Sequence, residues 1–406
     1  MKQKRPLEGI KILDLTWVYA GPFGTLLLSD LGAEVTKVEG PPFGDWTRVL
    51  PPLKDGWSGY FYMLNRGKKS VALNLKSDQG REVFLKLIKE VDVIAENFTP
   101  GTMDKMGLGY EQLKEVNPRI IYASISGFGT YGPYAKKRSV DPVAQAMGGL
   151  MSLTGYPEMP PLKTGPAIAD SLAGMNMVIG ILTALHNREK TGLGQRIDIS
   201  MMDSVFAVLE ESVVRTSMNG HPVPRRGNTD PGGAPWDTFP TSDNKLVMIC
   251  ALGGDTFYRA YKNIGREDLA EEYKGDDEEA IERRTEKQSY LNNEFAKWTK
   301  TKTVEEITAF CDEMAIPCGE VKNVEDLLTD PQLLARNMVI DIEHPKLGSV
   351  KTFNNPIKFS EIKAEVQPGE NPLDPQIGEH SAAMLQKLGY TGEDIEKLKK
   401  EKVIWV

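Results

Sequence analysis

Cysteine and histidine are scarce in this chain. Its 406 residues include four histidines and three cysteines, Cys250, Cys311 and Cys318. No CxxC pair or Cys/His cluster occurs, so the sequence predicts no metal site and no disulfide framework, and free thiols in a reducing cytoplasm are the expected state. The histidines show no Ser/His/Asp spacing and no metal-ligand spacing, so a nucleophile is sought among the carboxylates.

An excess of positive charge and long apolar runs are also missing. The net charge of -8 at pH 7 argues against a dedicated nucleic-acid binder, because such proteins present dense basic surfaces. No window of about 20 apolar residues is evident, so no membrane span is expected. Arg5, Pro6 and Glu8 interrupt the N-terminal stretch, so no signal peptide is expected either. The apolar fraction of 40% is typical of a globular protein.

Short β-branched runs alternate with helical patterns in the first half of the chain. The predicted strands are GIKILDL (9–15), AEVTKVE (33–39), SVALNL (70–75), VDVIAEN (91–97), RIIYASIS (119–126) and RIDISM (196–201). Helical spacing separates them, most clearly over 23–32, after the capping residue Ser77 and over 170–190. The alternation predicts an α/β fold with a parallel sheet covered on both faces, as in Rossmann-type domains.

The composition changes after residue 200. The stretch 218–245 is dense in Pro, Gly, Asn and Asp, which favours a loop or linker. A strand at 245–252 and three helical patterns between 254 and 314 indicate a second, smaller α+β domain. The expected organisation is a large Rossmann-like domain (1–200 plus 379–406), a linker (201–225), the small domain (226–330) and a returning linker (331–378).

The segment GFGTYG at 127–132 matches the dinucleotide-binding pattern GxGxxG directly after a predicted strand. A nicotinamide site needs the last glycine to open a helix, with an acidic residue about 20 positions further on. Here Pro133 and the basic cluster 136–138 follow instead, and no helix can begin before about Asp141. The glycines are therefore interpreted as a turn. The basic cluster is either a solvated face or, because it follows a strand of a parallel sheet, part of a site for a phosphorylated ligand.

Asp170 is the candidate nucleophile. It lies in TGPAIADSLAGM (164–175), between a small apolar segment and a helix rich in Gly, Ala and Met. Two roles fit this position. Asp170 is either the N-terminal cap of the helix, or a carboxylate that stays ionised beside backbone amides and attacks a carbonyl group. The residues by themselves leave both roles open.

Seven segments occur in the order found in one enzyme family. They are LDLTWVYAGP (13–22), LGAEVTKVE (31–39), NRGKKSVALNLK (65–76), AENFTPGTMDKMGLGY (95–110), GPAIADSLAGM (165–175), TGLGQRIDISMMDSV (191–205) and AIPCGEV (315–321). Over nearly its whole length the chain resembles the class III CoA-transferases, which include formyl-CoA:oxalate and carnitine CoA-transferases. The resemblance implies a Rossmann-like large domain, a smaller domain and two chains interlocked as rings, as a homodimer or as a heterodimer with a paralogous subunit.

The activity that the resemblance implies is transfer of CoA from an acyl-CoA donor, such as succinyl-CoA, to a free organic acid. CoA is then a co-substrate, and no metal is expected. Asp170 corresponds to the family's catalytic aspartate, which passes through an aspartyl acyl anhydride and an aspartyl-CoA thioester. The family's CoA contacts correspond by position to Val18, Tyr19, Ala20, Leu73, Asn97, Phe98, Lys105, Arg138, Val140 and Met201. Asp141 falls where some members carry a glutamate, and Trp17 and Tyr19 at the site entrance suggest a bulkier or aromatic dicarboxylate.

The chain departs from formyl-CoA transferase at four positions. Tyr19 replaces a glutamine, Val140 a tyrosine, and Lys105 and Gly40 each replace an arginine. These differences leave CoA binding expected but count against oxalate or formate as substrate. The family's glycine loop has no clear copy, and DPGGAPW (230–236) is the candidate for a lid over the site.

Two alternative functions come from other classes. An acyl-CoA racemase or epimerase of the same superfamily pairs the aspartate with a histidine, and SISGFGTYG (124–132) offers none. A non-catalytic subunit that binds CoA or supports an active partner is disfavoured by the presence of Asp170. Exchange of the α-proton without an acceptor acid would favour the racemase, and activity only with a second gene product would favour the subunit.

Overall fold

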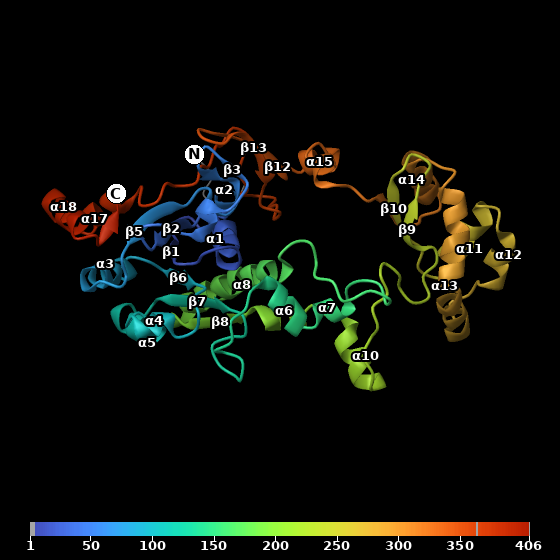
Figure 1. Cartoon of the computed structure of the whole chain (residues 1–406), viewed down its shortest axis with the longest axis horizontal. Coiled ribbons are helices and arrows are strands. Elements are labelled where there is room, and N and C mark those ends of the chain that lie inside the picture. The colour runs from blue at the N-terminus through green and yellow to red at the C-terminus, as the bar shows by residue number, and fades with distance from the viewer. Residues whose placement is uncertain (1–4, 363, 406) are drawn as a thin grey trace. The chain divides into compact units, whose positions relative to one another are not determined.

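The computed structural model describes residues 5–362 and 364–405. The chain divides into two compact units, whose elements are labelled in Figure 1. The larger unit comprises residues 1–152, 163–223 and 331–406, and the smaller unit comprises residues 153–162 and 224–330.

The larger unit is built on a seven-stranded sheet. In spatial order its strands are β14 (Ile404–Trp405), β5 (Lys69–Leu73), β2 (Glu34–Glu39), β1 (Lys11–Asp14), β6 (Val93–Glu96), β7 (Ile121–Ser126) and β8 (Arg196–Ser200). All neighbours pair in parallel except β14, which runs antiparallel to β5. From β1 the chain builds outward through β2 and β5, and then returns to build through β6, β7 and β8. A topological switch point therefore lies between β1 and β6, where ligand crevices form outside the carboxyl ends of strands.

Helices cover both faces of this sheet (Figure 1). Successive strand residues point to opposite faces, so Ile12 and Leu13 enter two different cores. One core is shared with α1 (Ala20–Asp30) and α8 (Ile168–Thr191), and the other with α3 (Asp78–Ile88). Burial on both faces explains why the strands appear in the sequence as continuous apolar runs. The predicted Rossmann-like α/β architecture is confirmed.

The other elements of the larger unit connect or follow these strands. They are the short helix Trp46–Val49, β3 (Leu53–Lys54), β4 (Trp57–Ser58), α2 (Gly59–Asn65), α4 (Thr102–Lys105), α5 (Tyr110–Val116), α6 (Asp141–Met147), α7 (Leu150–Leu153), α9 (Met201–Phe206), α10 (Glu211–Asn219), α17 (Ser381–Lys387) and α18 (Gly392–Lys400). Ser77 caps α3 as predicted, since its hydroxyl accepts a hydrogen bond from the Gly80 amide at 3.1 Å. Residues 331–378 carry α16 (Pro331–Ala335) and the antiparallel pair β12 (Val339–His344) and β13 (Gly348–Phe353).

α8 is a long apolar helix packed on the sheet. Among the described residues it is the one helix long and apolar enough to cross a membrane by length and composition. The expectation that the chain has no membrane span stays a prediction. Ala173, Met177 and Ile181 are fully buried in the core shared with the strands. The approach to α1 is close, because a Cβ atom on Gly174 would lie 2.6 Å from the Ala20 carbonyl oxygen. In this unit α8 packs as a core helix.

The smaller unit has its own antiparallel sheet and its own core. The strand order is β11 (Cys318–Glu320), β10 (Leu246–Cys250) and β9 (Trp236–Pro240). The helices are α11 (Gly254–Asn263), α12 (Glu267–Glu272), α13 (Glu278–Thr299), α14 (Val304–Glu313) and α15 (Val324–Leu327). Phe239, Phe257 and Phe295 are buried in the core. This is the smaller α+β domain that the sequence predicts, and all three cysteines lie in it as free thiols.

Candidate active site

A cavity of about 540 Å³ lies at the switch point of the larger unit's sheet. The loops that follow four strands supply its wall, with Trp17 and Val18 after β1, Asn97 and Phe98 after β6, Gly127 after β7 and Met201 after β8. Two carboxyl groups close the wall, those of Asp141, the first residue of α6, and Asp170, in the first turn of α8. These segments meet because the carboxyl ends of parallel strands share one edge of the sheet.

Asp170 lies in the first turn of α8, which begins at Ile168. The residue that caps this helix is Asp141, whose Oδ1 accepts hydrogen bonds from the Ala169 amide at 2.8 Å and from the Asp170 amide at 3.4 Å. Of the two roles that the sequence left open for Asp170, capping therefore falls to Asp141. The carboxyl group of Asp170 is left at the wall of the cavity.

Burial and a neighbouring charge raise the pKa of Asp170. The carboxyl group is largely removed from water and the Asp141 carboxylate lies nearby, so the pKa rises from 3.8 to about 7. The sequence-based expectation of a carboxylate that stays ionised is thereby modified, because near pH 7 both forms are populated. The ionised form is more basic than an exposed aspartate. Strongly raised pKa values of this kind gather at functional sites.

Asp141 is fixed in place by a chain of hydrogen bonds. Its side chain is buried, and its Oδ2 accepts from Gln145 Nε2 at 2.7 Å. Gln145 Oε1 in turn accepts from the Thr164 amide at 3.0 Å, in the segment that leads into α8. The two carboxyl groups are therefore held as neighbours by the fold, and the raised pKa of Asp170 is a built-in property of the site.

Aromatic side chains surround the approach to Asp170. The Ser171 hydroxyl donates to the Tyr19 hydroxyl at 3.3 Å, which ties Tyr19 to the residue after the candidate nucleophile. The ring of Tyr19 lies 6.4 Å from that of Tyr60. Burial, Tyr19 and the charge of Asp170 raise the pKa of Tyr60 to about 12, so its hydroxyl stays protonated close to Asp170. Tyr60 comes from α2, and no pattern in the sequence singles it out.

Most of the predicted site residues come together in this cavity. Its lining includes Trp17, Val18, Tyr19, Ala20, Asn97, Phe98, Arg138, Val140, Asp141, Asp170 and Met201. Leu73 lines a second cavity of about 350 Å³, which shares Trp17 and Phe98 with the first and also borders on Gly40. Lys105, at the end of α4, lines neither of these two cavities.

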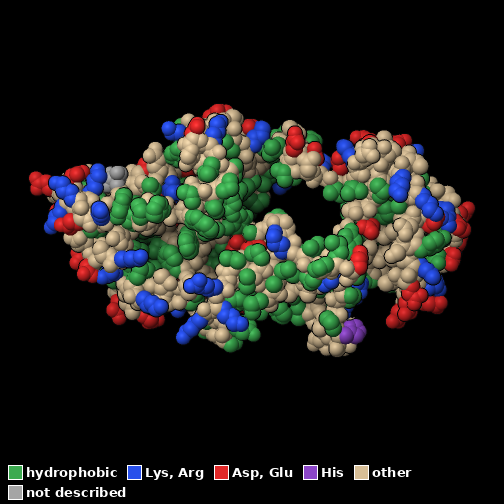
Figure 2. Space-filling model, in the orientation of Figure 1, with side chains coloured by type: hydrophobic (Ala, Val, Ile, Leu, Met, Phe, Trp, Pro, Cys, Tyr) green, Lys and Arg blue, Asp and Glu red, His purple; other side chains and the backbone are tan. Residues whose placement is uncertain are grey.

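The loop between β7 and α6 brings positive charge to the cavity. Lys137 and Arg138 both belong to the lining, although the predicted contacts include only Arg138. Figure 2 shows Lys and Arg side chains in blue over this loop, in the lower part of the view. The glycines of GFGTYG form the predicted turn, since Gly129 and Gly132 have φ values of 79° and 90° and α6 begins only at Asp141. The sequence signal for Lys137 is its place in the basic cluster.

The candidate lid, DPGGAPW (230–236), belongs to the smaller unit. Side chains of α13 hold its backbone there. Gln288 Nε2 donates to the Gly233 carbonyl at 2.6 Å, and Arg284 Nε donates to the Gly232 carbonyl at 2.9 Å. A role for this segment over the active site stays a prediction.

The cavity combines apolar walls, cations and the carboxyl groups of Asp141 and Asp170. The rings of Trp17 and Phe98 lie 6.4 Å apart, and Lys137 and Arg138 offer positive charge to a phosphate. In the part of the chain that the structure describes, no group of three or more His, Cys, Asp or Glu is placed to hold a metal ion. Chemically, the arrangement can hold an anionic ligand with an apolar portion and present Asp170 to it.

Comparison with known proteins identifies the family. Residues 7–381 match the model of CoA-transferase family III. An acetyl-CoA:oxalate CoA-transferase of Acetobacter aceti is 38% identical over 393 residues, which cover 95% of this chain and 96% of that protein. A succinyl-CoA:mesaconate CoA-transferase of Haloarcula hispanica is also 38% identical, over 94% of this chain and 96% of that protein. A crystal structure of a CAIB/BAIF family protein from Brucella suis matches with a TM-score of 0.83 at 36% identity, over 95% of this chain and 100% of that one. The chain belongs to CoA-transferase family III and is a CoA-transferase.

Proposed function

We propose that this enzyme moves CoA from an acyl-CoA donor to a free organic acid through covalent intermediates on Asp170. The observation that carries the proposal is the placement of this carboxyl group. It lines the cavity at the switch point of the sheet, and a neighbouring aspartate caps the helix in its place. Its pKa of about 7 leaves a basic carboxylate available near neutral pH.

In the first half-reaction the Asp170 carboxylate attacks the carbonyl carbon of the donor thioester. The carbon–sulfur bond breaks, CoA leaves as a thiolate, and an aspartyl acyl anhydride remains. The thiolate then attacks the aspartyl carbonyl, which releases the donor's acid and leaves an aspartyl-CoA thioester. Both steps exchange one acyl bond for another, so no electrons are gained or lost.

In the second half-reaction the acceptor carboxylate attacks the aspartyl-CoA thioester and again expels the CoA thiolate. The new anhydride joins Asp170 to the acceptor acid. Attack of the thiolate on the acceptor's carbonyl forms the product acyl-CoA and regenerates the Asp170 carboxylate. Covalent catalysis in this form divides one difficult exchange into four easier acyl transfers.

The two cavities support the binding of CoA. CoA is a long ligand with phosphates at one end and a thiol at the other, and the cavities share Trp17 and Phe98 as a common wall. Lys137 and Arg138 provide charge for phosphate groups beside the first cavity, and Lys76 does so beside the second. The thiol end is proposed to reach Asp170.

The aromatic wall supports an acceptor acid larger than oxalate. Tyr19 and Tyr60 stand next to Asp170, and Trp17 is 45% exposed at the side of the cavity. Flat rings of this kind suit the apolar part of a substituted or aromatic dicarboxylate. Succinyl-CoA is a proposed donor, in line with the name of the Haloarcula hispanica relative.

We also propose that two chains assemble in the cytoplasm. α8 exposes Met175, Ile179 and Leu182 at helical spacing, with 61% of the Ile179 side chain accessible in the single chain. An exposed apolar stripe on a helix whose other face packs in the core is typical of an interface. Light scattering of the purified protein checks the assembly, and a mass of 45.0 kDa would contradict it.

The experiment that tests the function measures CoA transfer between acyl-CoA donors and a panel of acids by mass spectrometry. Asp170→Asn and Asp170→Ala should each lose at least about a thousandfold in turnover, because the nucleophile is gone. Asp78→Asn is the matched control, since Asp78 also lies in the first turn of a helix but is 90% exposed. Hydroxylamine added during turnover should modify Asp170 alone. Undiminished turnover in either variant, a label elsewhere, or α-proton exchange without an acceptor acid would contradict the proposal.

A further inference from the structure

Val18 lines the cavity in a backbone conformation that branched residues rarely adopt. Its φ of 65° lies in the left-handed region, where the Cβ atom of an L-residue crowds the neighbouring carbonyl group. Such conformations persist only where the surrounding structure enforces them, and they gather at active sites. Val18 stands between Trp17 and Tyr19, so its backbone decides where both of these aromatic side chains lie.

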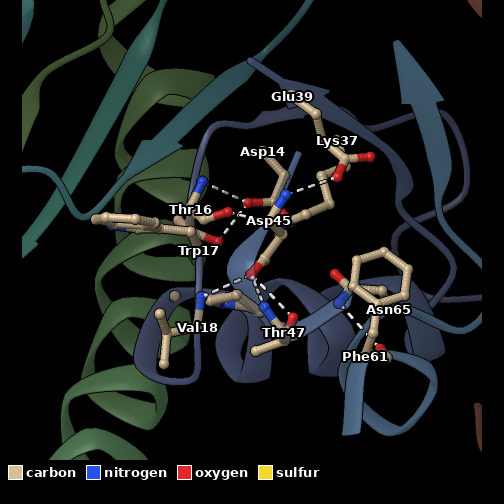
Figure 3. Close-up of polar contacts among 12 residues, drawn as sticks. Asp14, Thr16, Trp17, Val18, Lys37, Glu39, Asp45, Thr47, Phe61 and Asn65 are labelled. Carbon is tan, nitrogen blue, oxygen red and sulfur yellow. Dashed lines mark hydrogen bonds and ion pairs between the residues drawn. The ribbon is translucent and has the colours of Figure 1, made fainter. Parts of the chain in front are cut away.

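A buried aspartate holds the Val18 amide. Asp45 Oδ1 accepts a hydrogen bond from the Val18 N–H at 3.2 Å, and the same oxygen accepts from the Thr47 amide at 2.9 Å and the Thr47 hydroxyl at 2.8 Å (Figure 3). Asp45 Oδ2 pairs with Lys37 Nζ at 2.9 Å. The Asp45 and Lys37 residues are only 3% and 1% exposed, so this ion pair is shielded from solvent and salt.

The same lysine also holds the loop one residue earlier. Lys37 Nζ donates to the Thr16 carbonyl at 2.6 Å, while Asp14 Oδ1 accepts from the Thr16 amide at 2.9 Å (Figure 3). Asp14 is itself paired with the buried Lys68 at 2.9 Å. Each of these charges has a buried partner of opposite sign, so the charges balance within the cluster.

Asn97, which follows the neighbouring strand β6, holds the backbone of Trp17. Its Oδ1 accepts from the Trp17 amide and its Nδ2 donates to the Trp17 carbonyl, both at 2.9 Å. Every backbone N–H from Thr16 to Val18 is therefore bonded to a side chain rather than to secondary structure. A loop held in this way has little freedom to relax.

We propose that Asp45 is a positioning residue of the transfer reaction. It holds Val18 in the left-handed conformation against the strain of that conformation and thereby fixes Trp17 and Tyr19 beside the Asp170 carboxylate. This inference rests on the proposed role of Asp170. If the Trp17–Tyr19 segment is already held in one geometry, it does not have to rearrange before Asp170 attacks the bound thioester.

The test is a double-mutant cycle between Asp45 and Val18. Asp45→Ala removes the acceptor of the Val18 amide. Val18→Gly removes the Cβ atom and with it the strain at positive φ, whereas Val18→Ala removes the branched side chain but keeps the Cβ atom. The two Val18 variants therefore separate backbone strain from loss of side-chain contacts.

Asp45→Ala is expected to lower kcat about tenfold or more, with a smaller effect on KM for acyl-CoA, because alignment rather than affinity is lost. Adding Val18→Gly should restore kcat at least about threefold, since glycine adopts the required φ without help. Adding Val18→Ala should restore nothing. The proposal would be overturned if Val18→Gly and Val18→Ala had equal effects on kcat in the Asp45→Ala background. It would also be overturned if the losses in kcat from the changes at positions 45 and 18 simply added in free energy.

Asp45→Asn secures the test if the alanine variant fails to fold, as judged by circular dichroism and thermal unfolding. It keeps the shape of the side chain but has one oxygen instead of two, and that oxygen is drawn to the Lys37 ammonium group, which leaves an NH2 donor facing the Val18 amide. The same preference for Gly over Ala at position 18 is expected in this background, and its absence counts equally against the proposal.

Asp170→Asn separates this inference from the proposed function. Turnover that survives in Asp170→Asn contradicts the nucleophile, whatever the cycle shows. If turnover is abolished in Asp170→Asn but the changes at positions 45 and 18 act independently on kcat, only the proposed role of Asp45 is contradicted.

Discussion

Replacing Asp141 by asparagine should lower the pKa of Asp170. That pKa rises from 3.8 to about 7, with burial as the larger cause and the charge of Asp141 as the second. Asp141→Asn removes the charge but keeps a side-chain oxygen that can accept from the Ala169 amide, which lies 2.8 Å from Oδ1 of the native aspartate. Because the Asp141 share is the smaller one, we expect the pKa to fall by roughly 1 pH unit, which corresponds to about 1.4 kcal/mol of repulsion between the two carboxylates.

The pH profile of kcat/KM for acyl-CoA measures this change, because that ratio follows the ionisation of the free enzyme. In the proposed mechanism Asp170 reacts as the carboxylate, so kcat/KM should rise with pH through the pKa and level off above it. The wild-type midpoint is expected near pH 7. At pH 6 roughly a tenth of the Asp170 side chains are ionised in the wild type, but about half are ionised in the variant. Expressed as a fraction of each enzyme's plateau value, kcat/KM at pH 6 should therefore be about fivefold higher in the variant than in the wild type.

A midpoint that stays near pH 7, or moves upward, in Asp141→Asn would refute the electrostatic account of the site. Asp78→Asn serves as the control, since it removes one negative charge from an exposed first turn of α3 and should leave the midpoint unchanged. Thermal unfolding of each variant at pH 6 and pH 8 distinguishes a shifted pKa from a loss of folded protein.

Three further predictions concern binding and stability. Lys137→Ala should raise KM for acyl-CoA about tenfold with little change in kcat in steady-state assays, because a charge contact to phosphate is lost. Added salt screens that contact in the wild type, so it should reduce the difference in KM between the variant and the wild type. Gly174→Ala should lower the free energy of unfolding by about 1–3 kcal/mol in urea denaturation, because the new Cβ atom would lie 2.6 Å from a backbone oxygen of α1. Gly392→Ala is the control, since the space around Gly392 is open and no such loss is expected. Burial opposes the ionisation of Glu39, but Arg48, Lys37 and Ser70 together lower the pKa of its carboxyl group below the ordinary value of 4.5. The stabilisation by the Glu39 carboxylate is therefore present above pH 4.5 and is lost as the pH falls through the lowered pKa. Below pH 4.5 the Tm of Glu39→Gln should drop less steeply than the Tm of the wild type.

Local patterns in the sequence predicted much of the larger unit. Strands buried on both faces appear as short continuous apolar runs, and the helices between them carry their own caps, as Ser77 does for α3. The segment of α8 appears in the sequence as a helix rich in apolar residues, and its average hydropathy is that of a possible membrane span. The motif order and Asp170 pointed to the family before any contact was known.

The sequence by itself determined the sheet-forming segments, the family and the position of the candidate nucleophile, because each of these depends on residues adjacent in the chain. Tertiary structure alone decided the chemistry of that nucleophile. Asp141 lies 29 residues from the Asp170 amide that it contacts, and Asp45 lies 27 residues from Val18. Burial and charge proximity, which set the pKa of Asp170 and the conformation of Val18, exist only once the strands have brought these residues to one edge of the sheet.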